Sequence, residues 1–446
     1  MLQHPSFLRL LPLSLALAVA APAYAQSLTE LYGAARDYDA SYQSAKSQFD
    51  ATLAKAEQAK AALLPTVGLS ASANQYNTDA KEPTAKSYDW TDQKVAISAS
   101  QPLFRPANGA SYDQGLQQVK LANAQLVSAE QDLMVRVSQA YFDTLASQDN
   151  LELVQKQKTA VSEQLAAAKR NFEVGTATIT DTREAQARFD LVLAQELAAE
   201  NDLRVKRMAL QQLVGSAQAN PLPLREGTAL PTTTPEDVES WVTQAQAQHP
   251  ALQQLQVALD VAKLETKKAE AGHLPTLDLV GGYQISASQG TLSSTTGQAI
   301  NTRSGVASVG LSFNFPLYAG NAVTNRVRET AALQAKADTD LEASKRSIAQ
   351  GVRTAFFGVQ SGLGQVKALE AAEASSQSAL DANKLGYQVG VRINIDVLNS
   401  QSQLYDTKTK LAKARYDVLL GGLKLRQAAG VLKPDDLDAV SGLLAK

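Results

Sequence analysis

Long segments with helical composition alternate along this chain with short segments in which apolar and polar residues alternate. The long segments are rich in alanine, glutamine, lysine and glutamate, which favour helices, and they contain few glycines and prolines. The segments expected to be helical are 28–63, 106–172, 181–214, 235–248, 250–272, 320–386 and 396–429. Leu64-Pro65 ends the segment 28–63, and Leu274-Pro275 ends the segment 250–272 in the same way.

Four short segments show the period of two that is typical of β-strands. They are residues 66–76, 94–103, 277–286 and 306–315. In the last of these, Val309, Leu311 and Phe313 face one way and serine, glycine and asparagine face the other. Each segment has about the length of a tilted strand that crosses a bilayer. Half-buried hairpins of a soluble domain would show the same alternation, so the strands alone leave both interpretations open.

The chain reads as a tandem duplication. The segments NFEVGTATITD (171–181) and GYQVGVRINID (386–396) lie 215 residues apart, and each has Val-Gly followed six residues later by Asp. Glycine supplies the left-handed conformation that ends a helix, and Asp is a favourable N-cap for the next one. Both segments are therefore predicted to be sharp reversals between helices. We expect one repeat at 26–219, a Pro/Thr-rich linker at 220–235 and a second repeat at 236–446.

The helical segments predict a coiled architecture. Segments 28–63 and 181–214 together are about as long as 105–172, so two short helices stacked end to end would line one long helix. The last long segment has apolar residues at strict intervals of seven: Val397, Leu404, Leu411, Val418 and Leu425. A sustained seven-residue period indicates a left-handed coiled coil. We expect paired helices wound along a common axis.

Composition narrows the function classes. The 42 basic residues nearly balance 44 acidic residues, so no net field favours nucleic acid. The absence of cysteine excludes disulfides, thiolate metal sites and a lipid-modified N-terminal cysteine. His249 and His273 lie far apart beside turn signals, and we interpret them as ordinary turn histidines and not as a metal site. With no phosphate-cradling loop or catalytic constellation, we expect no enzyme activity, no catalytic residues and no cofactor.

The N-terminus predicts export. Arg9 precedes an apolar run, and Ala23-Tyr24-Ala25 resembles a cleavage site, so residues 1–25 are predicted to be a signal peptide. No later stretch reaches the ~20 apolar residues of a spanning helix. If the mature chain enters a membrane, it must do so as a β-barrel. Four strands cannot close a barrel, for which about eight are needed, and open edges are forbidden in lipid, so several chains must contribute. Three chains would give twelve strands.

The duplicated halves, the paired hairpins, the two Val-Gly-x5-Asp turns and the segment 396–430 resemble the TolC-type outer-membrane channels, over essentially the whole mature chain. The resemblance implies an α+β membrane protein: a homotrimer with a twelve-stranded barrel in the outer membrane, continued by a periplasmic α-helical coiled-coil barrel. It implies a passive exit duct for a tripartite efflux pump or for type I secretion. The expected partners are a periplasmic adaptor protein, an inner-membrane pump or ABC transporter, and outer-membrane lipid. Because the chain lacks a cysteine that could carry a lipid, it resembles the non-lipidated TolC branch of the family.

The resemblance also places a gate at the periplasmic end. It implies polar links that join Thr180 and Asp181 of the first turn to Tyr387 and Arg392 of the second. Simpler interpretations remain for three of these residues. Asp181 could serve only as an N-cap, Arg392 could be a solvated turn charge, and Tyr387 could simply pack.

Further site residues follow from the same resemblance. A lumen-facing acidic ring at the constriction falls on Asp396, which could also be only an N-cap. Asn399 stands one turn on, where a second acidic residue is expected, so the double ring is incomplete. Gly175 and Gly390 match positions that meet the periplasmic adaptor.

Two other function classes compete with a channel. A surface-exposed structural or adhesive coiled-coil protein is the main alternative, and the four strands of bilayer length and the duplication argue against it. An exported hydrolase would need a histidine-based triad or a metal cluster, and the sequence offers neither.

Overall fold

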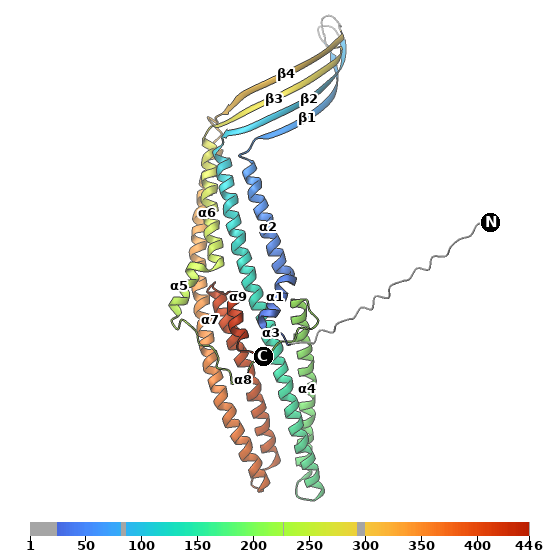
Figure 1. Cartoon of the computed structure of the whole chain (residues 1–446), viewed down its shortest axis with the longest axis vertical. Helices are drawn as coiled ribbons and strands as arrows, with labels where there is room; N and C mark the ends of the chain where they lie inside the picture. The colour runs from blue at the N-terminus through green and yellow to red at the C-terminus, as the bar shows by residue number, and fades with distance from the viewer. Residues whose placement is uncertain (1–24, 82–85, 226, 292–298, 446) are drawn as a thin grey trace, which may run out of the picture.

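The computed structural model describes residues 25–81, 86–225, 227–291 and 299–445, which form an elongated molecule (Figure 1). A sheet lies at one end of the long axis, and two helical turns lie side by side at the other end. The predicted signal peptide, 1–25, lies outside the described residues except for its last position. Within the described ranges, no helix combines the length and the apolar character needed to cross a membrane.

The sheet contains four antiparallel strands in chain order. They are β1 (Thr66–Ala80), β2 (Lys86–Phe104), β3 (Thr276–Thr291) and β4 (Ala299–Asn314). The four predicted strands are present, but each extends farther than predicted at the end away from the helices. Pairing continues there through polar residues, such as Asn77 opposite Asp89, where the apolar alternation has already stopped. Because β2 pairs with β3, the two halves of the chain share one sheet.

The register gives the sheet one apolar face. Leu69, Ile97, Tyr283 and Ala307 lie in one cross-strand row, and the adjacent row on the other face contains Gly68, Ser98, Gly282 and Ser308. The other apolar-face residues are Val67, Ala71, Val95, Ala99, Leu279, Ile285, Val309, Leu311 and Phe313. In the single chain Val309 is 81% exposed and Leu69 is 77% exposed. The apolar face therefore has no protein partner in the part of the chain that the structure describes.

Below the sheet, shorter helices pack along two long ones (Figure 1). The long helices are α3 (Pro106–Glu173) and α7 (Ala322–Gln388), with 68 and 67 residues. At 1.5 Å per residue each is about 100 Å long. Helix α2 (Ala40–Ala61) lies along α3, and α6 (Pro250–Glu270) lies between α3 and α7.

The segment predicted as one helix, 28–63, is two helices, so that prediction was wrong. Helix α1 (Leu28–Tyr38) ends at Asp39, whose carboxylate caps α2 by accepting from the Tyr42 backbone N–H at 2.8 Å. Arg136 of α3 also donates to this carboxylate at 2.9 Å. The hydrogen bond from Arg136 is the main cause of the lowered pKa of Asp39. An internal cap held by a distant arginine thus breaks a segment that contains no proline.

In the half of the molecule away from the sheet, α3 pairs with α4 (Ile179–Val214), and α7 pairs with α8 (Asn394–Ala428). The five heptad residues of α8 are all buried, which confirms the predicted helix-packing seam. Val397 and Leu404 pack with Leu380 of α7, and farther along Leu411 and Val418 pack with Val366. The seven-residue period therefore pairs α8 with α7.

The middle of the molecule contains its largest apolar core. Tyr141, Phe142 and Tyr416 lie there, with residues of α1 and of α9 (Pro434–Ser441). Sequence analysis missed α9, which is short and begins at Pro434. Helix α5 (Val238–Gln248) packs separately on α7. The connecting segment 220–235 is fixed to this core, because Tyr141 donates to the Leu222 carbonyl at 2.9 Å.

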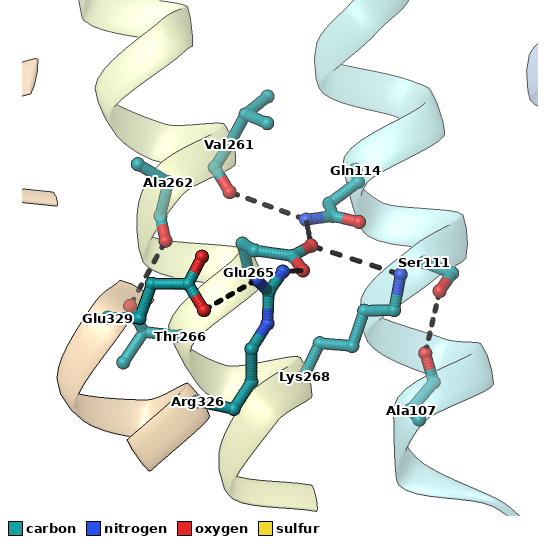
Figure 2. Close-up of polar contacts among 10 residues, drawn as sticks. All are labelled: Ala107, Ser111, Gln114, Val261, Ala262, Glu265, Thr266, Lys268, Arg326 and Glu329. Atoms are coloured by element: carbon teal, nitrogen blue, oxygen red, sulfur yellow. Dashed lines mark hydrogen bonds and ion pairs between the residues drawn. The ribbon is translucent and has the colours of Figure 1, made fainter. Parts of the chain in front are cut away.

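A polar cluster ties three helices together close to the sheet (Figure 2). Glu265 of α6 accepts hydrogen bonds from Gln114 of α3 at 2.8 Å and from Arg326 of α7 at 2.7 Å. The bond from Gln114 is the main cause of the lowered pKa of Glu265. Directly after α6 ends, the short 3-10 helix η1 (Ala271–His273) leads into β3. The cluster therefore holds the helices in place where the sheet begins.

Candidate gate at the helical turns

The first turn, between α3 and α4, is fixed by its own backbone. Gly175 has a φ of 77°, and the Thr176 N–H donates to the Asn171 carbonyl at 2.8 Å. The N-cap of α4 is Thr178, and Asp181 is the third helical residue. The Asp181 carboxylate accepts from the Thr178 N–H at 2.9 Å and from its hydroxyl at 2.7 Å. The prediction that Asp181 is the N-cap was wrong, because Thr178 takes that place and Asp181 completes a capping box.

The second turn, between α7 and α8, repeats this geometry with different polar contacts. Gly390 has a φ of 78°, and the Arg392 N–H donates to the Gly386 carbonyl at 3.1 Å. Helix α8 begins after Ile393, so Asp396 is its third residue and the N-cap prediction was wrong here also. Ile393 has no side-chain acceptor, and the Asp396 carboxylate instead lies 3.6 Å from the Arg392 guanidinium.

The four predicted gate-link residues lie at the two neighbouring tips, and Asp181, Tyr387 and Arg392 contact other partners within the chain. Tyr387 accepts a hydrogen bond of 3.3 Å from the Asn171 side chain, so one polar contact does join the turns. Tyr387 also packs beside the α7–α8 cluster. Thr180 is exposed, and within the described part of one chain neither it nor Asp181 contacts Arg392 or Tyr387 through a side-chain hydrogen bond. The predicted links remain predictions.

Asn399, the neutral residue at the predicted constriction, has a cationic partner that sequence analysis missed. Arg188 of α4 donates from Nη2 to the Asn399 Oδ1 at 2.8 Å. The contact joins positions 211 residues apart, so no local pattern could reveal it. The spacing of Ala185 and Val192, both buried, could have placed Arg188 near the packed face of α4.

An apolar contact holds the two hairpins together beside this bond. Leu398 of α8 is fully buried among residues of α3 and α4, including Val161, Leu165 and Ala185. The neighbouring side chains of Asn394 and Gln401 are also buried. The α7–α8 tip is thus seated against the α3–α4 tip.

The predicted adaptor positions, Gly175 and Gly390, lie at exposed turn apices. A Cβ atom added to either glycine would meet no atom within 4 Å. Exposed apolar side chains surround them: Phe172, Val174, Ile179, Leu385, Val389, Val391 and Ile393. The two tips therefore present a combined apolar surface that no described residue of the chain covers.

The two histidines take structural positions. His249 caps α6, with its Nδ1 accepting from the Ala251 N–H at 3.2 Å, and burial lowers its pKa. His273 ends the 3-10 helix before β3. Over the described ranges, no three His, Cys, Asp or Glu side chains gather closely enough to hold a metal ion.

Comparison with known proteins gives matches over nearly the full length. The family model described as "Outer membrane efflux protein" matches residues 31–216 and again 241–431, one match in each half. The outer membrane protein TolC of Vibrio cholerae is 34% identical over 440 residues, covering 98% of each chain. The alkaline protease secretion protein AprF of Pseudomonas aeruginosa is 32% identical, covering 94% of this chain and 87% of AprF.

Solved structures share the fold at lower identity. CusC superposes with a TM-score of 0.77 at 17% identity, covering 91% of this chain and 92% of that one. The open state of the Neisseria gonorrhoeae channel MtrE superposes with a TM-score of 0.70 at 20% identity, covering 91% of this chain and 90% of MtrE.

Proposed function

Because this chain belongs to the outer membrane efflux protein family, and is a non-enzymatic outer-membrane channel of the TolC type with a periplasmic helical extension, we propose that it works as a homotrimer. Its three sheets form one twelve-stranded barrel, and its helices form the tunnel below. The trimer is the exit duct through which a periplasmic adaptor and an inner-membrane pump or ABC transporter export their substrates. Family membership also decides against the alternative of a surface adhesive coiled coil.

The open sheet is the observation that carries this proposal. Strands β1 and β4 form its two edges, and neither edge is paired with another strand among the described residues. An unpaired strand edge in lipid leaves backbone N–H and C=O groups without partners, each at a penalty of several kcal/mol. Pairing β4 of one chain with β1 of the next removes every edge. The apolar face then meets lipid, and the row of Ser72, Lys94 and Ser286 lines a wet lumen.

The proposed adaptor surface is the pair of turn apices at Gly175 and Gly390. Large exposed apolar patches on soluble surfaces mark interaction sites. Here Val174 is 72% exposed and Val391 is 76% exposed. Left-handed glycines keep the apices free of side chains, so a partner can approach the backbone closely.

The proposed gate uses the residues at the same tips. Thr180 and Asp181 of one hairpin, and Tyr387 and Arg392 of another, link hairpins in the closed trimer. Thr180 is exposed and available for such a link, and the 3.6 Å separation between Arg392 and Asp396 leaves the guanidinium free to donate elsewhere. Asp396 forms the acidic ring at the constriction, with Asn399 one turn inward.

Complementation in a host that lacks its own channel tests the proposed duct. The wild-type chain should restore drug resistance or protein secretion and should appear in outer-membrane fractions as a heat-modifiable trimer. Gly390→Arg should assemble normally but lose this activity, since the new side chain covers the adaptor surface. Gly227 also has a positive φ and open space around it, so Gly227→Arg is the matched control and should retain activity. A chain that remains monomeric in the membrane would overturn the proposal.

A further inference from the structure

The bond between Arg188 and Asn399 places a positive charge beside the proposed constriction ring. Arg188 lies on α4 and Asn399 on α8, and the 2.8 Å hydrogen bond spans the seam between the two hairpins. Asn399 is one helical turn beyond Asp396, and side chains three positions apart on a helix are neighbours. The guanidinium therefore lies within about one turn of the acidic ring.

Over the described ranges, Arg188 forms no ion pair that would neutralise its charge. Its partner is an amide, which accepts the hydrogen bond but carries no charge. Among the described residues, no carboxylate lies within ion-pair distance of Arg188. The one acidic group of this turn, Asp396, is itself paired with Arg392. Arg188 thus adds one positive charge per chain beside Asp396.

Packing fixes the position of the helix that carries Arg188. Ala185 and Val192, which flank Arg188 at helical spacing, are buried in the cluster that surrounds Leu398. Leu398 directly precedes Asn399, so the apolar contact and the hydrogen bond hold the same pair of helices at the same height. Arg188 is half-buried, which restricts its side chain more than an exposed arginine would be restricted.

We propose that Arg188 determines the ion selectivity of the channel: held on Asn399, it offsets the acidic ring at Asp396 and makes the constriction only weakly attractive to cations. This inference rests on the proposed constriction. Charges interact over a screening length of about 8 Å at physiological salt, which exceeds the separation of neighbouring residues one turn apart. A passing cation therefore feels Arg188 and Asp396 together.

Planar-bilayer recording of the purified protein tests the inference, with the reversal potential in a KCl gradient and block by hexaamminecobalt(III) as readouts. Arg188→Gln should raise the ratio of cation to anion permeability and lower the blocking concentration on the order of tenfold, because three positive charges are lost. Arg188→Lys keeps the charge and should stay close to wild type. Arg204 is an exposed arginine about 24 Å farther along α4, so Arg204→Gln should change neither readout.

A second pair of variants separates the charge of Arg188 from its packing. Asn399→Asp alone should change block only weakly, on the order of threefold or less, because the new carboxylate pairs with Arg188. The same substitution in the Arg188→Gln background should strengthen block by at least about tenfold. Equal effects of Asn399→Asp in the two backgrounds would overturn the inference.

Asp396→Asn distinguishes this inference from the proposed constriction. If Asp396→Asn abolishes block while Arg188→Gln leaves both readouts at wild-type values, the acidic ring stands and the role of Arg188 is wrong. If block survives Asp396→Asn, the ring lies elsewhere, and the inference falls with it.

Discussion

Tyr416 of α8 donates a hydrogen bond of 2.7 Å to the Asp149 carboxylate of α3, which lies 267 residues earlier in the chain. The Tyr416 ring also stacks on Phe142, with 5.8 Å between the ring centroids. The hydrogen bond and the ring contact of Tyr416 join the two repeats in the apolar core at the middle of the molecule. Burial has the largest effect on the pKa of Asp149 and raises it. The hydrogen bond from Tyr416 lowers this pKa by a smaller amount, so the pKa stays raised.

The raised pKa predicts how Asp149 affects stability. A carboxyl group with a higher pKa in the folded than in the unfolded state binds its proton more tightly when folded. Its contribution to stability is therefore present below the unfolded pKa and is lost as the pH rises through the folded pKa. In Asp149→Asn no ionised carboxylate is buried at pH 7, so this cost is absent. The variant should therefore unfold at higher denaturant concentration than wild type at pH 7. The two should converge below about pH 4. Circular dichroism during denaturation across this pH range measures both.

Two controls accompany this prediction. Tyr416→Phe removes the donor and leaves the carboxylate buried, so at pH 7 it should destabilise by about 1.5–3 kcal/mol. Tyr405→Phe removes a hydroxyl with no hydrogen-bond partner among the described residues and should have little effect. If Asp149→Asn is less stable than wild type at pH 7, burial of the ionised Asp149 carboxylate does not destabilise the fold, and the prediction is wrong.

The junction between sheet and helices depends on an ion pair that also joins the two repeats. Arg105, between β2 and α3, donates from Nε to Asp278 of β3 at 2.7 Å and from Nη2 to the second carboxylate oxygen. The Asp278 side chain is 9% exposed and that of Arg105 is 43% exposed. Arg105→Gln should therefore lower the melting temperature, though by less than the loss of a fully buried pair would. Asp278→Asn should cost less, since Arg105 remains half in water.

Thermal denaturation in detergent checks this order. Lys345→Gln breaks an exposed ion pair with Glu342 and should change stability by less than about 1 kcal/mol. The double variant Arg105→Gln, Asp278→Asn should recover part of the loss, because no unpaired carboxylate is left. If Asp278→Asn proves the more damaging change, the asymmetry of burial does not govern this site.

Two glycines with similar backbone angles should respond differently to alanine. Gly390 and Gly430 have φ values of 78° and 71°. An added Cβ at Gly390 meets nothing within 4 Å, whereas at Gly430 it would lie 2.4 Å from the His249 Cα. Gly390→Ala should cost about 1 kcal/mol of backbone strain. Gly430→Ala should cost at least about 3 kcal/mol, because the backbone of His249 must also move. Similar melting temperatures for the two variants would refute this account.

The gate prediction combines Arg392→Ser with Tyr387→Phe. The first change removes the guanidinium near Asp396, and the second changes the hydroxyl bonded to Asn171. Charge-assisted hydrogen bonds contribute about 1.5–3 kcal/mol each, and the gate would contain three copies. A few kcal/mol shifts a two-state gate substantially, so single-channel conductance in planar bilayers should rise. The matched variant Arg204→Ser, Tyr405→Phe should leave conductance unchanged. Unaltered conductance in an intact trimer of the first variant would remove both residues from the gate.

Sequence predicted the features that depend on local patterns. The positive φ of Gly175 and Gly390, and the burial of Val397 and Leu404, follow from turn chemistry and from the heptad period. The structure also bears out a sheet built from both repeats. The N-cap of α4 was misassigned because a capping box leaves Asp181 at the third helical position, where its side chain reaches back to Thr178. At the start of α8, Asp396 also stands at the third helical position, but its carboxylate lies beside Arg392 and forms no capping box.

The remaining features depend on contacts between distant segments. The break at Asp39 is stabilised by Arg136, 97 residues away, and the bond from Arg188 to Asn399 depends on how two hairpins pack. The alternation of apolar residues ended before the strands did, because hydrogen-bond pairing in a hairpin does not require an apolar face. Such contacts are determined by tertiary packing, and no pattern along one segment specifies them.

The unpaired edges of β1 and β4 also bear on biogenesis. A newly exported chain presents two strands with free backbone groups and a broad apolar face before any partner arrives. Exposed edges of this kind pair readily with other chains, whether correct or incorrect. In the proposed homotrimer, completion of the barrel and encounter between subunits are therefore one event, whose rate rises steeply with the concentration of chains in transit. Slow synthesis favours degradation of isolated chains, and overproduction favours aggregation before insertion.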